Sequence, residues 1–285
     1  MGEVAIHHLG LAGAGQALDV AVRLEPVRAP DLGDGGAAWL RGPNLFLRLG
    51  DGDPPGPRPV NAPGIAHLCV QSRAGDAARG ALERAGVRFL SEPVALGTGF
   101  LYAYAHDSAG RLLELESAPF LPDEPAAWFG HVAFVSRDAE RLAGFYAHLL
   151  GAAVTPGGRF RDNACVDRVA GLDGVDVEVW WVRDRRFTLE FWRYHTPAYD
   201  GPDVDGWYTS LGLETDDLDA ALARVREAGG ATEDVMTGAD GRAARARDPD
   251  GNRLQLIELA SPSLGTATLP HADALARAAA ARAAA

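Results

Sequence analysis

GHVAFVSRDAERLAGFYAHLLGA, residues 130–152, predicts an apolar strand that carries His131, followed directly by a helix with apolar residues at helical spacing. The chain opens on a similar strand, VAIHHLGLAG, residues 4–13. Two other segments, 64–117 and 210–260, each predict a strand, a helix that ends at Ala-Gly, a strand, and a turn leading into a last strand. The chain is therefore an internal repeat of four modules, in the order type one, type two, type one, type two.

Connectors rich in proline and glycine separate the modules, as is typical of loops between units. They cover residues 50–64, 118–130 and 195–206. Module one is short: its helix region, 15–26, is abbreviated, and residues 42–52 are all that close it. We expect module one to be a degenerate unit.

The charge balance argues against nucleic acid and anionic membranes as partners. With 27 Lys+Arg against 39 Asp+Glu, the formal net charge is −12, and no basic run is interleaved with aromatic residues. Nucleic acid and anionic membrane are therefore excluded as partners. The N-terminus lacks the pattern of a signal peptide and no segment approaches a membrane span, so we expect a soluble cytoplasmic protein. The Ala-rich tail, residues 263–285, carries no chemistry.

Three segments resemble the glyoxalase, bleomycin-resistance and extradiol-dioxygenase superfamily, also called vicinal oxygen chelate proteins. They are HVAFVSRDAERLAGFYAHLLG from His131, TLEFWRY from Thr188 and DPDGNRLQLIEL from Asp248, and the resemblance extends to about Ala260. It implies an α+β fold of four βαβββ modules, which form two cup-shaped eight-stranded mixed sheets. The expected glyoxalase-like domains are residues 1–120, with modules one and two, and residues 128–262, with modules three and four.

In that family, metal ligands occupy one position on the first strand and one on the last strand of each module. In module order, the first-strand position holds His8, His67, His131 and Ser210. The last-strand position holds Phe46, Glu114, Glu190 and Gln255. Imidazole and carboxylate ligands suit a divalent ion of Fe, Ni, Zn, Co or Mn.

Two arrangements of the modules are possible, and they predict different ligand sets. If neighbouring modules share a cup, modules one and two supply His8, His67 and Glu114, the two-histidine one-carboxylate set of an extradiol dioxygenase. If the halves exchange modules, modules two and three supply His67, Glu114, His131 and Glu190, the set of a glyoxalase I site. We favour exchange, because it concentrates the missing ligands in one cup.

The resemblance implies a metal-dependent lyase or isomerase, in which Glu190 or Glu114 moves a proton at carbon. Residues two apart share a strand face, so Cys69 and Trp192 lie beside the ligands and, with Tyr194, are expected in the substrate pocket. The substrate would be a small or aromatic organic molecule, and the chain a monomer or homodimer. An extradiol-type dioxygenase and a metal-free drug-binding protein are the alternatives.

Overall fold

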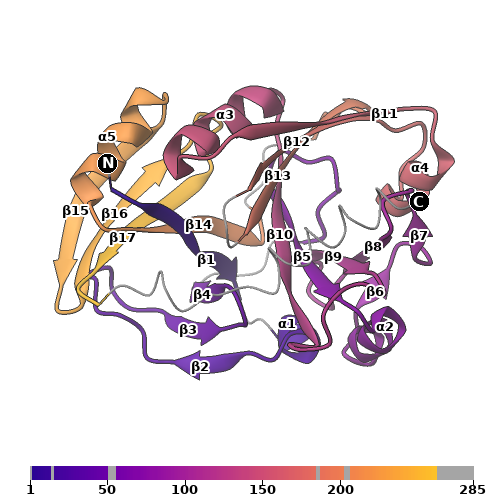
Figure 1. Ribbon diagram of the computed structural model, residues 1–285, viewed down its shortest axis with the longest axis horizontal. Helices are drawn as coiled ribbons and strands as arrows, with labels where there is room; N and C mark the ends of the chain where they lie inside the picture. The colour runs from indigo at the N-terminus through magenta and orange to yellow at the C-terminus, as the bar shows by residue number, and fades with distance from the viewer. Residues whose placement is uncertain (1, 14–15, 51–55, 184–186, 202–205, 262–285) are drawn as a thin grey trace.

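Figure 1 shows the computed structural model of the protein. The structure describes residues 2–13, 16–50, 56–183, 187–201 and 206–261. The predicted Ala-rich tail, 263–285, lies outside the described residues.

Every module follows the order strand, helix and further strands. Module one contains β1 (Val4–Ala12), α1 (Gln16–Ala21), β2 (Glu25–Val27), β3 (Ala38–Arg41) and β4 (Phe46–Gly50). Module two contains β5 (Gly64–Ser72), α2 (Gly75–Arg84), β6 (Arg88–Phe89), β7 (Val94–Ala95), β8 (Leu101–His106) and β9 (Leu112–Ser117). Module three contains β10 (Ala127–Val135), α3 (Ala139–Leu150), β11 (Val154–Phe160), α4 (Ala164–Ala170), β12 (Asp176–Arg183) and β13 (Thr188–Thr196). Module four contains β14 (Tyr208–Thr215), α5 (Leu218–Glu227), β15 (Ala231–Gly238), β16 (Gly241–Arg247) and β17 (Arg253–Leu259).

The prediction that module one is degenerate is wrong in one respect. Its helix is short, at 6 residues, but all four strands of a βαβββ unit are present. The strand β3 was missed because it begins only at Ala38, after a long irregular segment that carries no alternating pattern.

The modules exchange between the halves of the chain to form two mixed sheets. Sheet A has the order β15-β16-β17-β14-β1-β4-β3-β2 and so combines modules four and one. Sheet B has the order β11-β12-β13-β10-β5-β9-β8-β6, with β7 paired to β8, and combines modules three and two. The predicted fold class is confirmed, with nine strands in sheet B in place of the expected eight. Each sheet takes one module from the predicted domain 1–120 and one from 128–262.

Alternation along the strands, interrupted by register shifts in β1 and between β5 and β10, gives each sheet an apolar face and a second face that carries polar residues. In sheet B, Leu68, Val132 and Leu189 belong to the main hydrophobic core, which the helices also join. Their neighbours His67 and His131 lie on the opposite, concave face, because successive side chains of a strand point to opposite sides. The large apolar core thus fixes which side chains the concave faces display.

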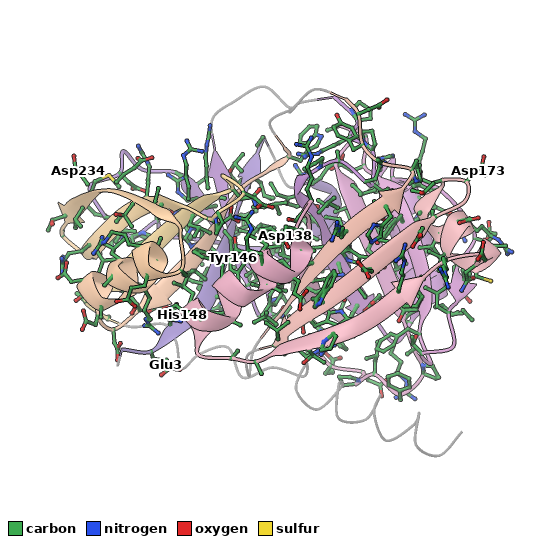
Figure 2. The ribbon with its side chains drawn as sticks, turned by 90° about the horizontal axis from the view of Figure 1, so that it is seen from above. Glu3, Asp138, Tyr146, His148, Asp173 and Asp234 are labelled. Carbon is green, nitrogen blue, oxygen red and sulfur yellow. The ribbon has the colours of Figure 1, made fainter. Side chains whose placement is uncertain are left out.

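Contacts between modules hold the two sheets together. Figure 2 shows α3 in the middle of the molecule, with Asp234 of β15 at one end and Asp173, beyond α4, at the other. From α3, the Tyr146 hydroxyl donates a hydrogen bond of 2.9 Å to Asp248 in module four. None of the helices in the described residues has the length and apolar character needed to cross a bilayer.

Arg111 is a second link between the sheets, and it is fully buried. It directly precedes β9 of sheet B, yet its guanidinium donates a 3.3 Å hydrogen bond to the Ala12 carbonyl of β1 in sheet A. The guanidinium carbon also lies 5.2 Å from the ring centroid of Trp207, just before β14. Asp107, at 3.7 Å, balances the charge of the guanidinium.

Candidate metal centre

The structure brings His67, Glu114, His131 and Glu190 together on the concave face of sheet B. His67 lies on β5 and His131 on β10, the two antiparallel strands at the centre of the sheet. Glu114 lies on β9 opposite Cys69, two residues beyond His67. Glu190 lies on β13 opposite Ala133, two residues beyond His131. The same local register in both modules therefore aims all four side chains at one place.

His131 Nε2 lies within 3.4 Å of a ligand atom of each of the other three residues. Glu114 Oε2 lies 2.8 Å from His131 Nε2 and 3.2 Å from His67 Nε2. The two Nε2 atoms are 3.3 Å apart, and Glu190 Oε2 is 3.4 Å from that of His131. All four side chains are shielded from solvent, and Glu190 is the most accessible, at 13%.

Opposite charges inside this cluster outweigh the effect of burial. Burial favours a neutral imidazole, but the carboxylates of Glu190 and Glu114 outweigh it and raise the pKa of His131 to about 10. Burial likewise disfavours a charged Glu114, but hydrogen bonds from His131 and His67 prevail and lower the pKa of that carboxyl to about 2. The carboxylates of Glu114 and Glu190 therefore stabilise the positive charge of a protonated His131, and they would stabilise a metal cation in the same way.

The donor set fits a divalent metal ion. The Nε2 atoms of His67 and His131 lie 3.3 Å apart, and each offers a lone pair when neither is protonated. The carboxylates of Glu114 and Glu190 both approach His131 Nε2. Two histidines with two carboxylates are ligands that Fe, Ni, Zn, Co and Mn accept. A cation at this point would replace the shared proton and satisfy all four groups.

In the part of the chain that the structure describes, the possible ligand atoms that lie within 4.8 Å of one another form two groups, one of His67, His131 and Glu190 and one of Cys69, Glu114, Glu116 and His131. Burial raises the pKa of the Cys69 thiol well above its usual value and that of Glu116 to about 7. Cys69 is fully buried and is not among the residues that line the neighbouring cavity, so its predicted place in the substrate pocket is corrected.

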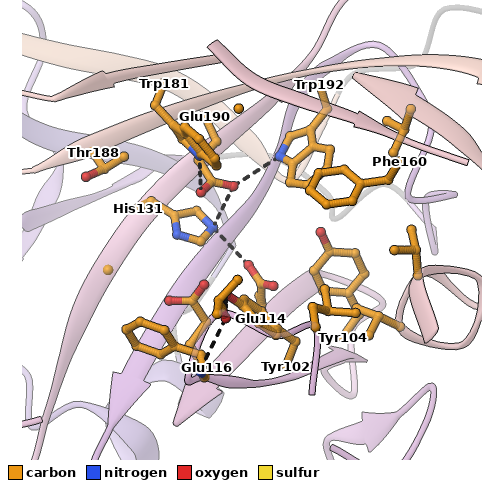
Figure 3. A pocket seen from close by; sticks show the side chains of 18 of the residues that line it. Tyr102, Tyr104, Glu114, Glu116, His131, Phe160, Trp181, Thr188, Glu190 and Trp192 are labelled. Atoms are coloured by element: carbon orange, nitrogen blue, oxygen red, sulfur yellow. Dashed lines mark hydrogen bonds and ion pairs between the residues drawn. The ribbon is translucent and has the colours of Figure 1, made fainter. Parts of the chain in front are cut away.

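A cavity of about 280 Å³ opens beside Glu114, His131 and Glu190 (Figure 3). Trp192 and Tyr194 line it, as expected for a substrate pocket. Other aromatic residues complete its wall: Phe100, Tyr102, Tyr104, Phe160 and Trp181. Their planar, apolar faces suit an aromatic or otherwise hydrophobic organic molecule.

Two indoles hold Glu190 at the edge of this cavity. Trp181 Nε1 donates to Glu190 Oε1 at 2.8 Å, and Trp192 Nε1 donates to Oε2 at 3.1 Å (Figure 3). The sequence shows Trp181 only as one of many aromatic residues, and its role depends on the pairing of Trp181 on β12 with Glu190 on β13. No single-strand pattern reveals such a cross-strand contact.

Comparison with known proteins gives one family match. Residues 128–256 match the family model of the Glyoxalase/Bleomycin resistance protein/Dioxygenase superfamily. The match covers modules three and four. No curated protein matches the chain.

Solved structures of the superfamily share the fold of the whole chain. Glyoxalase I from Zea mays is 18% identical, with a TM-score of 0.63, over 90% of this chain and 93% of that one. A proposed dioxygenase from Bacillus subtilis subsp. subtilis str. 168 is 16% identical, with a TM-score of 0.61, over 90% and 86% of the two chains. At these identities, the likeness is one of fold alone.

The superfamily's ligand positions are also identifiable in sheet A, and there the predicted register of module one is wrong. Gln255 lies opposite Gly212, two residues beyond Ser210, as expected. Phe46, however, lies directly opposite His8, and the residue opposite Gly10, two beyond His8, is Arg48. The last-strand position of module one is therefore Arg48. A shift of two residues keeps the side chain on the same face, so hydrophobic alternation could not detect it.

His8 takes part in a chain of hydrogen bonds and joins no ligand cluster of the described residues. Its Nε2 lies 2.9 Å from Gln255 Oε1 and its Nδ1 lies 3.0 Å from His7 Nδ1. The predicted extradiol triad of His8, His67 and Glu114 is thus corrected, because His8 belongs to sheet A and the other two to sheet B.

Both histidines of this pair are buried and neutral, which predicts a loss of stability at mildly acidic pH. Burial lowers the pKa of His7 to about 3, although Glu214 lies 3.9 Å away, and lowers that of His8 well below its usual value. Between about pH 3 and pH 6.5, His7 is protonated in the unfolded chain but neutral in the folded chain. The stabilisation is complete above pH 6.5 and decreases as the pH falls.

We expect His7 alone to reduce the free energy of unfolding by about 2 kcal/mol between pH 7 and pH 5. Denaturant unfolding at both pH values measures this difference, and the His7→Phe chain should show a smaller one. The matched control is His148→Gln, an exposed histidine on α3, which should leave the pH dependence unchanged. Equal pH dependence in all three chains would contradict the prediction.

Proposed function

We propose that the chain is a metal-dependent, glyoxalase-like lyase or isomerase that moves a proton at a carbon atom of a small aromatic or hydrophobic substrate. The observation that carries the proposal is the convergence of His67, Glu114, His131 and Glu190 beside an aromatic cavity of about 280 Å³. These four residues would hold one divalent ion of Fe, Ni, Zn, Co or Mn. When bound, such an ion supplies polarisation of a substrate carbonyl or hydroxyl.

Glu190 is the better placed of the two candidate bases. It lines the cavity and is more accessible than Glu114, whose carboxylate lies between two histidines. The indoles of Trp181 and Trp192 fix its orientation, so a proton taken from a substrate in the cavity would be received at a defined position. Glu114 would stay with the histidines throughout.

The aromatic wall would exclude water and orient the substrate. Tyr102, Phe160 and Trp192 surround the space in front of Glu190 (Figure 3). An aromatic compound with adjacent carbonyl and hydroxyl groups would place its ring among these side chains and its two oxygens toward His131 and Glu114. The chemistry therefore favours an aromatic α-hydroxyketone as the first probe.

Elemental analysis and proton exchange together test the proposed function. Protein purified without chelator should contain about one divalent ion per chain, and it should exchange the α-proton of 2-hydroxyacetophenone in D2O, followed by NMR. Glu190→Gln should slow this exchange by about 100-fold or more, the usual contribution of a general base. Trp128→Phe, at a buried indole outside the cavity lining, is the control.

Three results would count against the proposal. A Glu190→Gln chain that retains both metal and exchange would remove Glu190 from the mechanism. Protein that takes up no metal, yet binds the aromatic probe, would favour the metal-free binding protein. Ring cleavage with consumption of oxygen, in place of exchange, would favour a dioxygenase.

A further inference from the structure

The concave face of sheet A contains a cavity of a very different kind. Its volume is about 340 Å³. It is lined by four arginines and one acidic residue, together with small, polar and aliphatic ones: Arg48, Thr209, Ser210, Glu233, Arg245, Ala246, Arg247, Arg253, Leu254 and Gln255. A cluster of four guanidinium groups is unexpected in a chain with a formal net charge of −12.

The strand register shows that this cavity occupies the position in sheet A that the metal centre occupies in sheet B. Its charged residues are mainly basic where those of the metal centre are acidic. Arg48 occupies the position that Glu190 has in sheet B, and Gln255 occupies that of Glu114. Ser210 takes the place of His67, so His8 remains as the counterpart of His131. Two carboxylates are thus replaced by a cation and a neutral amide, which makes the position unfavourable for a metal ion and favourable for an anion.

The carboxylate of Asp34, from the same chain, already binds Arg48 and Gln255 in this cavity. Leu32, in the segment between β2 and β3, packs against Ala243 and Ile257 on sheet A. The same segment places Asp34 so that its Oδ2 accepts hydrogen bonds from Arg48, at 3.2 Å, and from the Gln255 amide, at 2.9 Å. The Asp34 side chain is only 6% exposed. Sheet A therefore already binds one carboxylate oxygen where sheet B would bind a cation.

Among the described lining residues, Glu233 is the one acidic side chain beside the other three arginines. Arg247 and Arg253 lie directly opposite each other on β16 and β17, a juxtaposition of like charges that destabilises a sheet. Arg247 donates to the Gly251 carbonyl, and among the described residues no side-chain hydrogen bond or ion pair is found for Arg245 or Arg253. An anion between them would relieve the repulsion, and guanidinium groups bind phosphate and carboxylate oxygens in pairs.

We propose that the arginine-lined cavity of sheet A binds a small polyanion that bears phosphate or clustered carboxylate groups. Arg245, Arg247 and Arg253 would contact its oxygens, and the Ser210 hydroxyl would contribute a further hydrogen bond. Asp34 competes with the ligand for Arg48, because its carboxylate is the negative charge closest to that guanidinium. The site is separate from the metal centre, which lies on the other sheet.

Calorimetric titration of the full chain with pyrophosphate, and separately with citrate, tests this proposal and distinguishes the two kinds of ligand. Titrations are made at constant ionic strength with sodium chloride as the blank. The Arg245→Gln/Arg253→Gln chain should bind at least about 10-fold more weakly than the unchanged chain. The matched control, Arg23→Gln/Arg88→Gln, removes two exposed charges elsewhere and should bind unchanged.

Asp34→Asn gives the sharper test, because it should increase affinity. Removal of the competing carboxylate frees Arg48 while Leu32 still anchors the segment, and we expect binding to be tightened by about 10-fold. A gain cannot result from misfolding. The proposal is overturned if neither the unchanged chain nor Asp34→Asn shows saturable binding, or if the control pair weakens binding as much as the cavity pair does.

Discussion

Replacement of His131 by alanine is expected to weaken metal binding by at least about 100-fold. His131 is the one residue common to both groups of possible ligands, and it contacts His67, Glu114 and Glu190. Its removal deprives an ion of a central nitrogen ligand whichever group binds it. Elemental analysis after dialysis against a defined concentration of zinc or nickel gives the bound fraction.

Two further variants locate the ion within the cluster. His67→Ala should lose metal and Cys69→Ala should retain it if the histidine and carboxylate set is the site; the reverse result would favour the group of Cys69 and Glu116. His8→Ala, the counterpart of His131 in sheet A, is the matched control and should keep its metal. Since His131 is buried, His131→Gln serves as a variant of similar volume, and far-UV circular dichroism confirms folding. Full retention of metal by both His131 variants would refute the assigned ligand set.

Replacement of Arg111 by alanine is expected to lower the free energy of unfolding by about 3 kcal/mol. The change would leave the buried carboxylate of Asp107 without its charged neighbour and would remove the hydrogen bond to Ala12 of sheet A. It would also remove the stacking on Trp207. Because these contacts join the two sheets, the loss is larger than that of an ordinary surface ion pair.

Denaturant unfolding followed by circular dichroism measures this loss. Arg111→Lys should recover only part of it, since lysine keeps the charge but lacks the planar fork and its stacking. Arg79→Ala is the comparison within one module: Arg79 pairs with the exposed Glu83 and Glu92 and lies 5.0 Å from the Phe89 ring centroid, and loss of these solvent-screened contacts should cost less than about 1 kcal/mol. Similar losses for Arg111→Ala and Arg79→Ala would show that the buried arginine does not join the sheets.

The fold and the four central side chains could be predicted because they depend on local patterns. Alternation fixes the buried face of each strand, and the repeat of modules aligns His67 with His131 and Glu114 with Glu190. The resemblance to the superfamily then indicated which face carries the ligands. The distribution of these residues over the modules also favoured the exchanged arrangement, which the strand order confirms.

The parts that were missed depend on contacts between different elements. The indole of Trp181 on β12 reaches Glu190 on the adjacent β13, and Asp34 reaches Gln255 across 221 positions of the chain. Shifts in register, such as the one between Ile6 and His8 on β1, change which residues face each other without any change in composition. Propensity and periodicity describe single elements, so they carry no information on such partners.

The exchange of modules also determines how this chain could be divided. In each sheet the hydrogen bonds at the centre, β1 to β14 and β5 to β10, join the first half of the chain to the second. Either half on its own would leave β1 and β5, or β10 and β14, as long open edges that invite pairing with another chain. Two copies of one half could close these edges by forming a symmetric dimer with two equivalent clefts. Within a single chain the two clefts can differ, and here one holds paired carboxylates while the other is lined by arginines.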